Sequence, residues 1–182
     1  MKELSLYILD ITENSTRAGA KNISLEITEE GSRFSFSVSD DGCGMSEETV
    51  KKLSDPFYTT RTTRKVGLGI PFLRLAAEQT GGHIEISSRS AEQFPDTHGT
   101  KTSAFFDSSH IDFVPLGDII STVVTLIQGN PDTDFVFTHT KDGKLVSLDT
   151  KELRAVLEGV PLDSFPVLEW IRESLSEQYS QM

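Results

Sequence analysis

Three side chains of different chemistry share one stripe of a predicted N-terminal helix. Asp10, Asn14 and Arg17 are spaced i, i+4 and i+7, so a helix would bring them to the same side. A carboxylate, an amide oxygen and a guanidinium aimed into one pocket could hold a water molecule, a Mg²⁺ ion and a phosphate group. The same spacing also fits a solvated helix face with an incidental ion pair. The helix by itself leaves both interpretations open.

A second candidate lies where a predicted strand runs into Asp40-Asp41-Gly42-Cys43-Gly44. The carboxylate of Asp40 could accept a hydrogen bond from the amino group of a nucleotide base. Glycines at positions 42 and 44 would let the backbone pass close beside such a ligand. The alternative is a tight loop in which the aspartate caps backbone N–H groups.

A third segment, residues 55–70, combines hydroxyl groups, cations and glycines directly before an apolar helical pattern. Its cations are Arg61, Arg64 and Lys65, which supply the positive charge that a polyphosphate needs. Gly67-Leu68-Gly69 would let the backbone approach a ligand, and the helix that follows offers free N–H groups to a phosphate. A basic glycine loop is also common as a solvated turn, so this segment alone does not establish a phosphate site.

The periodicity of apolar residues predicts the elements that must position these groups. Alternating strands leave one apolar face to be covered, and the amphipathic helices can cover it. We therefore expect residues 1–106 to form a two-layer α/β sandwich, a mixed sheet with helices on one face. The expected elements are a helix at 2–20, a strand hairpin at 23–27 and 34–38, a helix at 71–79, and strands at 83–88 and 99–106.

Composition narrows the class of protein. The 182 residues, 36% hydrophobic and 25% charged, are typical of one soluble globular domain with a small appendage. The net charge of −11 argues against nucleic acid or an anionic membrane as a partner. The single cysteine, Cys43, cannot form an internal disulfide, and no apolar run is long enough to span a bilayer. We therefore expect a cytoplasmic protein.

The order of these segments resembles the GHKL ATP-binding family, which includes gyrase, heat-shock chaperone ATPases, histidine kinases and MutL. The resemblance runs from about residue 2 to residue 106. Its five segments, in the family's order, are the helix with Asp10 and Asn14, Asp40-x-Gly42-x-Gly44, Phe57-Tyr58-Thr59-Thr60-Arg61, Gly67-Leu68-Gly69 and Gly99-Thr100. The first two look most like MutL, whereas the Phe-Tyr-Thr-Thr-Arg segment looks more like histidine kinases.

The resemblance implies an adenine site built from the second and fifth segments. Asp40 matches the carboxylate that hydrogen-bonds the adenine amino group. Gly42 and Gly44 match the glycines that let the backbone pass beside the base. Thr100 matches a hydroxyl close to adenine, which often acts through a water molecule.

On the phosphate side, the resemblance implies ATP and Mg²⁺ as ligands. Asn14 matches the asparagine that ligates the Mg²⁺ bridging the triphosphate, and Arg17 lies where relatives carry a basic residue near the phosphates. Gly67-Leu68-Gly69 matches the segment over the phosphates. Phe57 matches the residue that begins a lid over the nucleotide. The implied ligand-binding residues of that lid are Thr59, Thr60, Arg61 and Lys65.

The chain departs from the family at three points. The hydrolysing members carry Glu where this chain has Asp10, whose side chain is one methylene shorter. Asp10 is therefore a candidate general base, and the sequence leaves open whether it can activate a water molecule. The chain shows no helix with a phosphoacceptor histidine, and it begins almost at the first motif helix. We therefore expect any phosphorylated target to be a separate protein.

Residues 107–182 match no family segment and are expected to form a small α/β extension. The hairpin within it could supply an edge strand to the sheet or form an independent subdomain. Trp170 is expected in the core of this extension, with a role in an interface as the alternative. The expected elements are a helix at 116–128, a hairpin at 134–139 and 144–148, and helices at 151–158 and 165–175.

Three functions are compatible with these segments. The first is a regulatory protein kinase acting in trans on a separate protein, as the stand-alone anti-sigma kinases of the family do. The second is an ATP-gated conformational switch with weak ATPase activity, in the manner of MutL, with a homodimer as one possible state. The third is a non-catalytic ATP-binding module of a larger regulatory assembly. The sequence does not name the partner.

Overall fold

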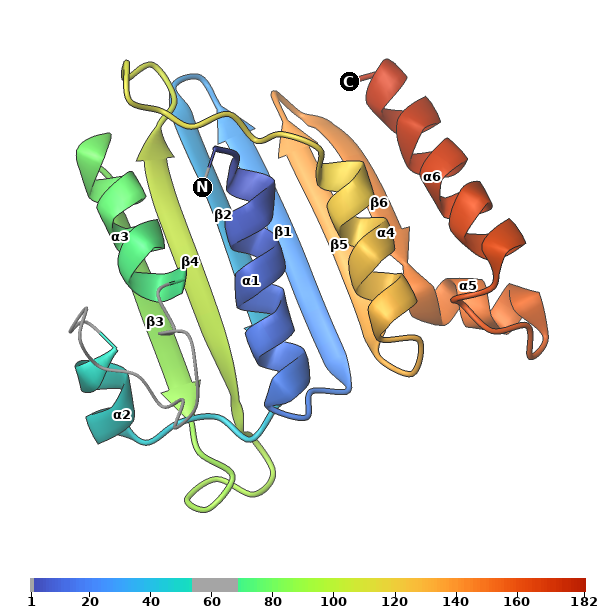
Figure 1. The fold of residues 1–182 in the computed structure, drawn as a ribbon, viewed down its shortest axis with the longest axis horizontal. Coiled ribbons are helices and arrows are strands. Elements are labelled where there is room, and N and C mark those ends of the chain that lie inside the picture. The colour runs from blue at the N-terminus through green and yellow to red at the C-terminus, as the bar shows by residue number, and fades with distance from the viewer. Residues whose placement is uncertain (1, 54–68) are drawn as a thin grey trace.

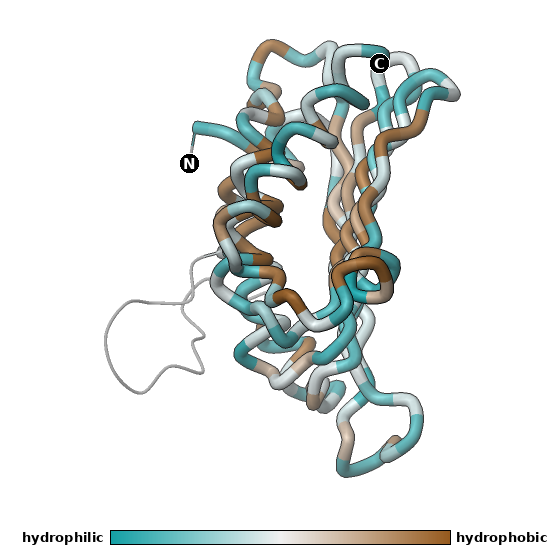
Figure 2. The backbone as a smooth tube through the Cα atoms, turned by 90° about the vertical axis from the view of Figure 1, so that its right-hand side faces the viewer, coloured by the Kyte–Doolittle hydropathy of each residue, from teal (hydrophilic) through white to brown (hydrophobic). Residues whose placement is uncertain are grey.

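A six-stranded mixed sheet, covered on one side by helices, forms the framework of the protein (Figure 1). The structure is a computed structural model that describes residues 2–53 and 69–182. In the side view the helices form one layer and the strands another (Figure 2). The predicted two-layer α/β sandwich is therefore confirmed. No helix within the described ranges has the length and apolar character needed to cross a membrane.

Helices, single or in pairs, alternate along the chain with pairs of antiparallel strands. In chain order they are α1 (Leu4–Arg17), β1 (Asn22–Glu30), β2 (Arg33–Asp40), α2 (Glu47–Lys52), α3 (Gly69–Gln79), β3 (His83–Arg89), β4 (Gly99–Asp107), α4 (Ile119–Gly129), β5 (Asp134–Lys141), β6 (Lys144–Asp149), α5 (Thr150–Leu157) and α6 (Phe165–Ser180).

The strand order is β3-β4-β2-β1-β5-β6, and each neighbouring pair is antiparallel except β1 and β5. Strand β5 lies parallel to β1, with Ile23 opposite Phe135 and Ile27 opposite His139. The C-terminal hairpin therefore continues the same sheet. The sequence left open whether this hairpin adds an edge strand to the sheet or forms a separate subdomain. The structure contains the first arrangement.

The core lies between the sheet and the helices. Alternate residues of each strand point to the helix side, as the period of two requires. Leu25 of β1 and Val38 of β2 are opposite each other and almost fully buried, and α1 covers this side with Leu4 and Ile8. The opposite face of β1 and β2 carries mostly serine, threonine and glutamate. The apolar core therefore lies on one side of these two strands.

The C-terminal part is joined to α1 as well as to the sheet. The N–H groups of Leu4 and Ser5 donate to the carbonyl oxygens of Pro115 and Leu116, at 2.9 and 2.8 Å. These bonds satisfy two of the unpaired donors at the start of α1. Helix α4 then packs beside α1, and α6 packs beside α4 (Figure 1).

One buried polar cluster interrupts the apolar core under α6. The ring of His139 on β5 is 2% exposed, with Nδ1 2.7 Å from the hydroxyl of Tyr179 and Nε2 3.0 Å from a carboxylate oxygen of Glu29. Lys141 forms an ion pair of 3.1 Å with the other oxygen of Glu29. Burial lowers the pKa of His139 and outweighs the opposing effect of Glu29. Burial also raises the pKa of Tyr179.

Two expectations for the extension need correction. Helix α4 begins at Ile119 rather than at 116, because Asp118 is its N-cap and accepts a hydrogen bond from the N–H of Ser121. The expectation that Trp170 lies in the core is wrong, since its side chain is 51% exposed. Helix α6 buries the stripe Val167, Leu168, Ile171 and Leu175, and Trp170 falls outside it.

Candidate functional site

Asp40, at the end of β2, collects hydrogen bonds from three elements. One carboxylate oxygen, Oδ1, accepts from the N–H of Gly42 at 2.9 Å and from the N–H of Thr100 at 3.3 Å. The other, Oδ2, accepts from the hydroxyl of Ser15 on α1 at 2.5 Å. These donors fix the orientation of a partly buried carboxylate whose remaining lone pairs can accept from a ligand.

The neighbouring aspartate has a different role. Asp41 accepts from the backbone N–H groups of Lys21 and Asn22 at 2.8 and 2.9 Å, and from the side-chain amide of Asn22 at 2.7 Å. Burial acts to raise the pKa of Asp41, but the hydrogen bonds from Asn22 and Lys21 outweigh it and lower the pKa. Asp41 therefore caps the start of β1, and Asp40 is the aspartate that bonds into the interior.

The glycine loop after Asp40 is fixed from several sides. The N–H of Cys43 donates to the carbonyl of Ala18 at 2.9 Å, and His98 places Nδ1 2.6 Å from the carbonyl oxygen of Gly42. A carbonyl only accepts, so Nδ1 of His98 carries the proton. Gly44 has φ +64°, and a side chain there would collide with the carbonyl oxygen of Arg89. The loop thus requires glycine at position 44 for both conformation and space.

Thr100 lies directly beside Asp40, because the register of β2 and β4 pairs them. Its hydroxyl is 2.8 Å from the hydroxyl of Ser88, which lies opposite Thr100 on β3. Ser88 also donates to the carbonyl of Gly99 at 3.1 Å and accepts from the N–H of Met45 at 2.8 Å. Asp40, Thr100 and Ser88 therefore form a polar row across β2, β4 and β3, at the end of the apolar core.

The helix stripe of Asp10, Asn14 and Arg17 has one internal bond in the structure. Arg17 donates from Nη1 to the side-chain oxygen of Asn14 at 3.0 Å. The carboxylate of Asp10 approaches the first residue of α3, where a side chain on Gly69 would collide with its Oδ2 oxygen. Asp10 thus lies where the segment of residues 55–70 leads into α3. Phe57, Thr59, Thr60, Arg61, Lys65, Gly67 and Leu68 lie outside the described residues.

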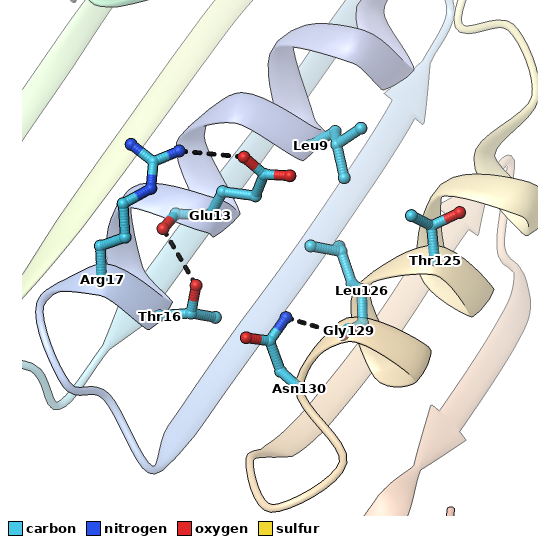
Figure 3. A pocket seen from close by; sticks show the side chains of 8 residues that line it. All are labelled: Leu9, Glu13, Thr16, Arg17, Thr125, Leu126, Gly129 and Asn130. Carbon is cyan, nitrogen blue, oxygen red and sulfur yellow. Dashed lines mark hydrogen bonds and ion pairs between the residues drawn. The ribbon is translucent and has the colours of Figure 1, made fainter. Parts of the chain in front are cut away.

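A hollow of about 250 Å³ lies on the other flank of α1, between α1 and α4 (Figure 3). Glu13 and Arg17 line it and form an ion pair of 2.9 Å (Figure 3). The lining residues are Leu9, Glu13, Thr16, Arg17, Thr125, Leu126, Gly129 and Asn130. Of the candidate site residues in the described ranges, Arg17 alone also lines this hollow. The polar row is the stronger candidate for a ligand site, because hydrogen bonds from Ser15, Gly42 and Thr100 orient the carboxylate of Asp40.

The described residues contain no group of three or more histidine, cysteine, aspartate or glutamate side chains arranged to hold a metal. Asn14 is exposed and supplies one side-chain oxygen. One amide oxygen together with phosphate oxygens is a suitable ligand set for Mg²⁺.

Sequence reasoning missed three residues of the site: Ser15, Ser88 and His98. Two of them leave a signal that could have been used. Ser15 continues the buried stripe of α1, and Ser88 continues the inward alternation of Ile84 and Ile86. A hydroxyl at an inward position of an otherwise apolar pattern needs a hydrogen-bond partner. His98 lies in an irregular segment without periodicity, so no such signal marks it.

By its fold and its polar row, the protein is a two-layer α/β sandwich with a hydrogen-bonding site at the end of its sheet. A family model of histidine kinase-, DNA gyrase B- and HSP90-like ATPases matches residues 2–110, more than half of the chain. The chain belongs to this family, and it carries a GHKL-type ATP-binding domain.

Two curated relatives match about half of the chain. Sporulation kinase C of Bacillus subtilis (strain 168) is 27% identical over 92 residues, which are 50% of this chain and 21% of that protein. The sensor histidine kinase ZraS of Escherichia coli O157:H7 is 29% identical over 87 residues, which are 47% and 19%. The chain spans about a fifth of the length of these relatives.

Solved structures match a larger share of the fold. The ATPase domain of Aquifex aeolicus MutL, solved with ADP, superimposes with a TM-score of 0.56 at 14% identity, covering 87% of this chain and 70% of that one. The N-terminal domain of a DNA repair protein gives a TM-score of 0.56 at 16% identity, covering 82% and 53%. At these identities the likeness concerns the fold.

Proposed function

We propose that the domain binds Mg²⁺-ATP, with the adenine amino group donating to Asp40. The observation that carries this proposal is the fixed carboxylate at the end of β2, which Ser15, Gly42 and Thr100 hold in one orientation. An acceptor held in this way suits the exocyclic amino group of adenine and disfavours the carbonyl oxygen of guanine. ADP bound to the MutL domain supports the choice of an adenine nucleotide.

The triphosphate would extend from the base along α1 toward α3. Asn14 would supply a side-chain oxygen to Mg²⁺, and Arg17 a guanidinium to a phosphate oxygen. Gly67-Leu68-Gly69 would lie over the phosphates. The lid residues Phe57, Thr59, Thr60, Arg61 and Lys65 would close over them. Asp10 would lie near the end of the triphosphate, since its carboxylate faces the start of α3.

As the activity of this site we propose regulatory phosphorylation of a separate protein. A nucleophilic side chain of that protein would attack the γ-phosphorus, the bond from that phosphorus to the bridging oxygen would break, and ADP would leave. Asp10 would accept the proton if the nucleophile is a hydroxyl. Similarity to a sporulation kinase and to a sensor histidine kinase supports phosphoryl transfer over other reactions of the family.

A second candidate function is an ATP-gated switch with weak ATPase activity. Arg17 favours this function, because it donates a hydrogen bond to Asn14 and also lines the hollow between α1 and α4. A change at Arg17 on nucleotide binding would reach the C-terminal part through this hollow. The third candidate, a non-catalytic binding module, is favoured by the short side chain of Asp10.

Radiolabelled ATP distinguishes the three candidates. The protein is incubated with γ-labelled ATP and Mg²⁺, first alone and then with extract of the cells it comes from. A labelled partner supports the kinase, release of phosphate by the protein alone supports the switch, and binding without either supports the module. Asp40→Asn is the loss-of-binding variant, and Asp41→Asn is its matched control on the adjacent residue. Failure of the wild-type protein to retain ATP would overturn the proposal as a whole.

A further inference from the structure

Four large apolar side chains are exposed on the two C-terminal helices and the link between them. Val156 on α5 and Phe165 on α6 are 79% and 75% exposed. Val160, in the link, and Trp170 on α6 are each about half exposed. Single exposed apolar residues are normal on a protein surface, whereas a group of them marks an interaction site. We call these four residues the α5–α6 patch.

The backbone that carries the patch is held in place. Two turns form the link: the N–H of Val160 donates to the carbonyl of Leu157 at 3.1 Å, and the N–H of Ser164 donates to the carbonyl of Pro161 at 3.2 Å. The side chain of Leu162, between these N–H groups, is fully buried. Helices α5 and α6 pack on β5 and β6 (Figure 1). The patch is therefore presented by an ordered backbone, which lowers the entropy cost of binding a partner.

Carboxylates surround these apolar side chains. On α6, Glu169 follows Phe165 by four residues and is its neighbour on the helix surface. Glu173 follows Trp170 by three residues and is placed in the same way. The acidic residues of α5, the link and α6 are Glu152, Glu158, Asp163, Glu169, Glu173 and Glu177.

Basic side chains of the same stretch offset little of this charge. Arg154 is paired with Asp134 of β5 at 2.8 Å, and Arg172 lies 3.9 Å from Glu169. Lys151 is the third basic residue between position 150 and the C-terminus. The surface around the patch is therefore negative.

This charge decides between the possible occupants of the patch. A second copy docked through the same patch would bring two acidic sets together, because a twofold contact uses the same surface on both copies. An anionic membrane surface would be repelled in the same way, and the net charge of −11 adds to the repulsion. A partner with lysine or arginine beside its own apolar side chains is complementary in both respects.

We propose that the α5–α6 patch is a docking surface for a partner protein, which binds through an amphipathic, basic helical segment. Phe165 and Trp170 are the apolar anchors, since aromatic side chains carry much of the binding energy of protein interfaces. Glu169 and Glu173 pair with the cations of the partner. The patch lies outside residues 2–110, which the family model matches, so this docking does not depend on the proposed binding of ATP.

The test uses a defined peptide and the full chain without nucleotide. The probe is a helical peptide of about 18 residues, made of leucine, lysine and alanine, with its leucines on one face. Trp170 is the only tryptophan of the chain, so its fluorescence reports on this surface. We expect a saturable shift of its emission to shorter wavelengths as the peptide covers the ring. The affinity should fall as salt is raised, because salt screens the charges.

Two pairs of variants locate the binding surface, with affinities measured by calorimetry. Phe165→Ser should weaken peptide binding by about tenfold, the effect of losing one anchor. Its control is Leu145→Ser, which removes an exposed leucine from the other face of β6. Glu173→Lys should also weaken binding, and Glu92→Lys, at an exposed position between β3 and β4, makes the same change of charge elsewhere. Both control variants should bind as the wild type does.

Several results would overturn the proposal. They are an emission that does not change with the peptide, and equal binding of a scrambled peptide of the same composition, which would reduce the effect to general charge attraction. Equal losses of affinity in a variant and its control would place the binding elsewhere. A wild-type dimer in sedimentation experiments that Phe165→Ser converts to a monomer would assign the patch to a second copy. Failure of the protein to bind ATP would leave the docking proposal standing, because the peptide is tested without nucleotide.

Discussion

Arg17 holds the side-chain oxygen of Asn14 through a hydrogen bond of 3.0 Å and is held in turn by Glu13 through an ion pair of 2.9 Å. Asn14 is the residue proposed to bind Mg²⁺. If Mg²⁺ binds this oxygen as proposed, its charge would repel the guanidinium, and Arg17 would have to leave Asn14. The phosphates offer Arg17 the replacement partner. The ion pair with Glu13 would oppose this exchange of partners.

Glu13→Gln is therefore expected to strengthen ATP binding. The ion pair is about half exposed, with side-chain exposures of 48% and 47%, so solvent screens it and its loss changes affinity by only about twofold. Calorimetry with Mg²⁺-ATP measures the change. Glu177→Gln on α6 removes the same charge elsewhere and corrects for the general effect of net charge. Equal affinities in the two variants would contradict a restraining role for Glu13.

Asn14→Ala is expected to remove the dependence of nucleotide binding on Mg²⁺. Mg²⁺ usually takes one or two protein oxygens besides phosphate oxygens and water, so the loss of this ligand should uncouple the ion from the nucleotide. The measurement is ATP affinity with Mg²⁺ and with a chelator, in the wild type and the variant. If Mg²⁺ strengthens binding equally in both proteins, the ion is held elsewhere.

Asp40→Asn is expected to weaken ATP binding by about ten- to a hundredfold, the value of a charge-assisted hydrogen bond in a partly buried site. GTP binding should change much less, because guanine presents a carbonyl at that position. Asp41→Asn serves as the control, since Asp41 bonds the start of β1 and not the ligand side. A change in ATP affinity within twofold would remove Asp40 from its proposed role.

The buried cluster at His139 predicts how stability depends on pH. The pKa of His139 is lowered in the folded protein, so below about pH 6.5 the unfolded chain takes up a proton that the folded chain does not. Stability should fall as the pH is lowered from 6.5 through the folded pKa, by at most about 1.4 kcal/mol per pH unit. Urea unfolding midpoints between pH 7.5 and 5 measure this slope.

The matched variants for that slope are His139→Gln and His83→Gln. The first removes the buried ionisable ring and should flatten the slope, although it also lowers stability at neutral pH by disturbing Tyr179 and Glu29. The second removes a ring whose side chain is 59% exposed, and it should leave the slope as in the wild type. An unchanged slope in His139→Gln protein would assign the pH dependence to other groups.

Local patterns in the sequence were enough to predict the helices and strands and their arrangement in two layers. Strict alternation in β1 and β2, and the apolar stripe of α1, specify which side each element buries. They could not specify that β5 pairs with β1, because parallel pairing joins segments far apart in the chain and leaves no local signal. The prediction for Trp170 was wrong because it relied on residue type. Its position on α6, outside the stripe of buried residues, determines its exposure.

The same distinction applies to the residues of the candidate site: some could be found from local motifs, and others only from the packing of the elements. Asp40, Gly44 and Thr100 stand in short motifs, so their proximity could be expected before the register of β2 and β4 was known. Ser15, Ser88 and His98 reach the site through bonds between elements, and such bonds depend on three-dimensional packing. The bond from Arg17 to Asn14 follows from helical spacing, but the spacing alone did not tell whether Arg17 would meet Asn14, Glu13 or solvent.

The parallel pairing of β1 with β5 also has a consequence for how the protein is made. Strand β1 leaves the ribosome early, whereas its partner β5 follows only after residues 31–133. At typical rates of synthesis this interval is on the order of ten seconds, during which one edge of β1 presents unpaired N–H and C=O groups. A nascent chain in this state can pair with other extended chains. A fragment that ends at residue 106 would keep this edge open permanently and would be prone to aggregate.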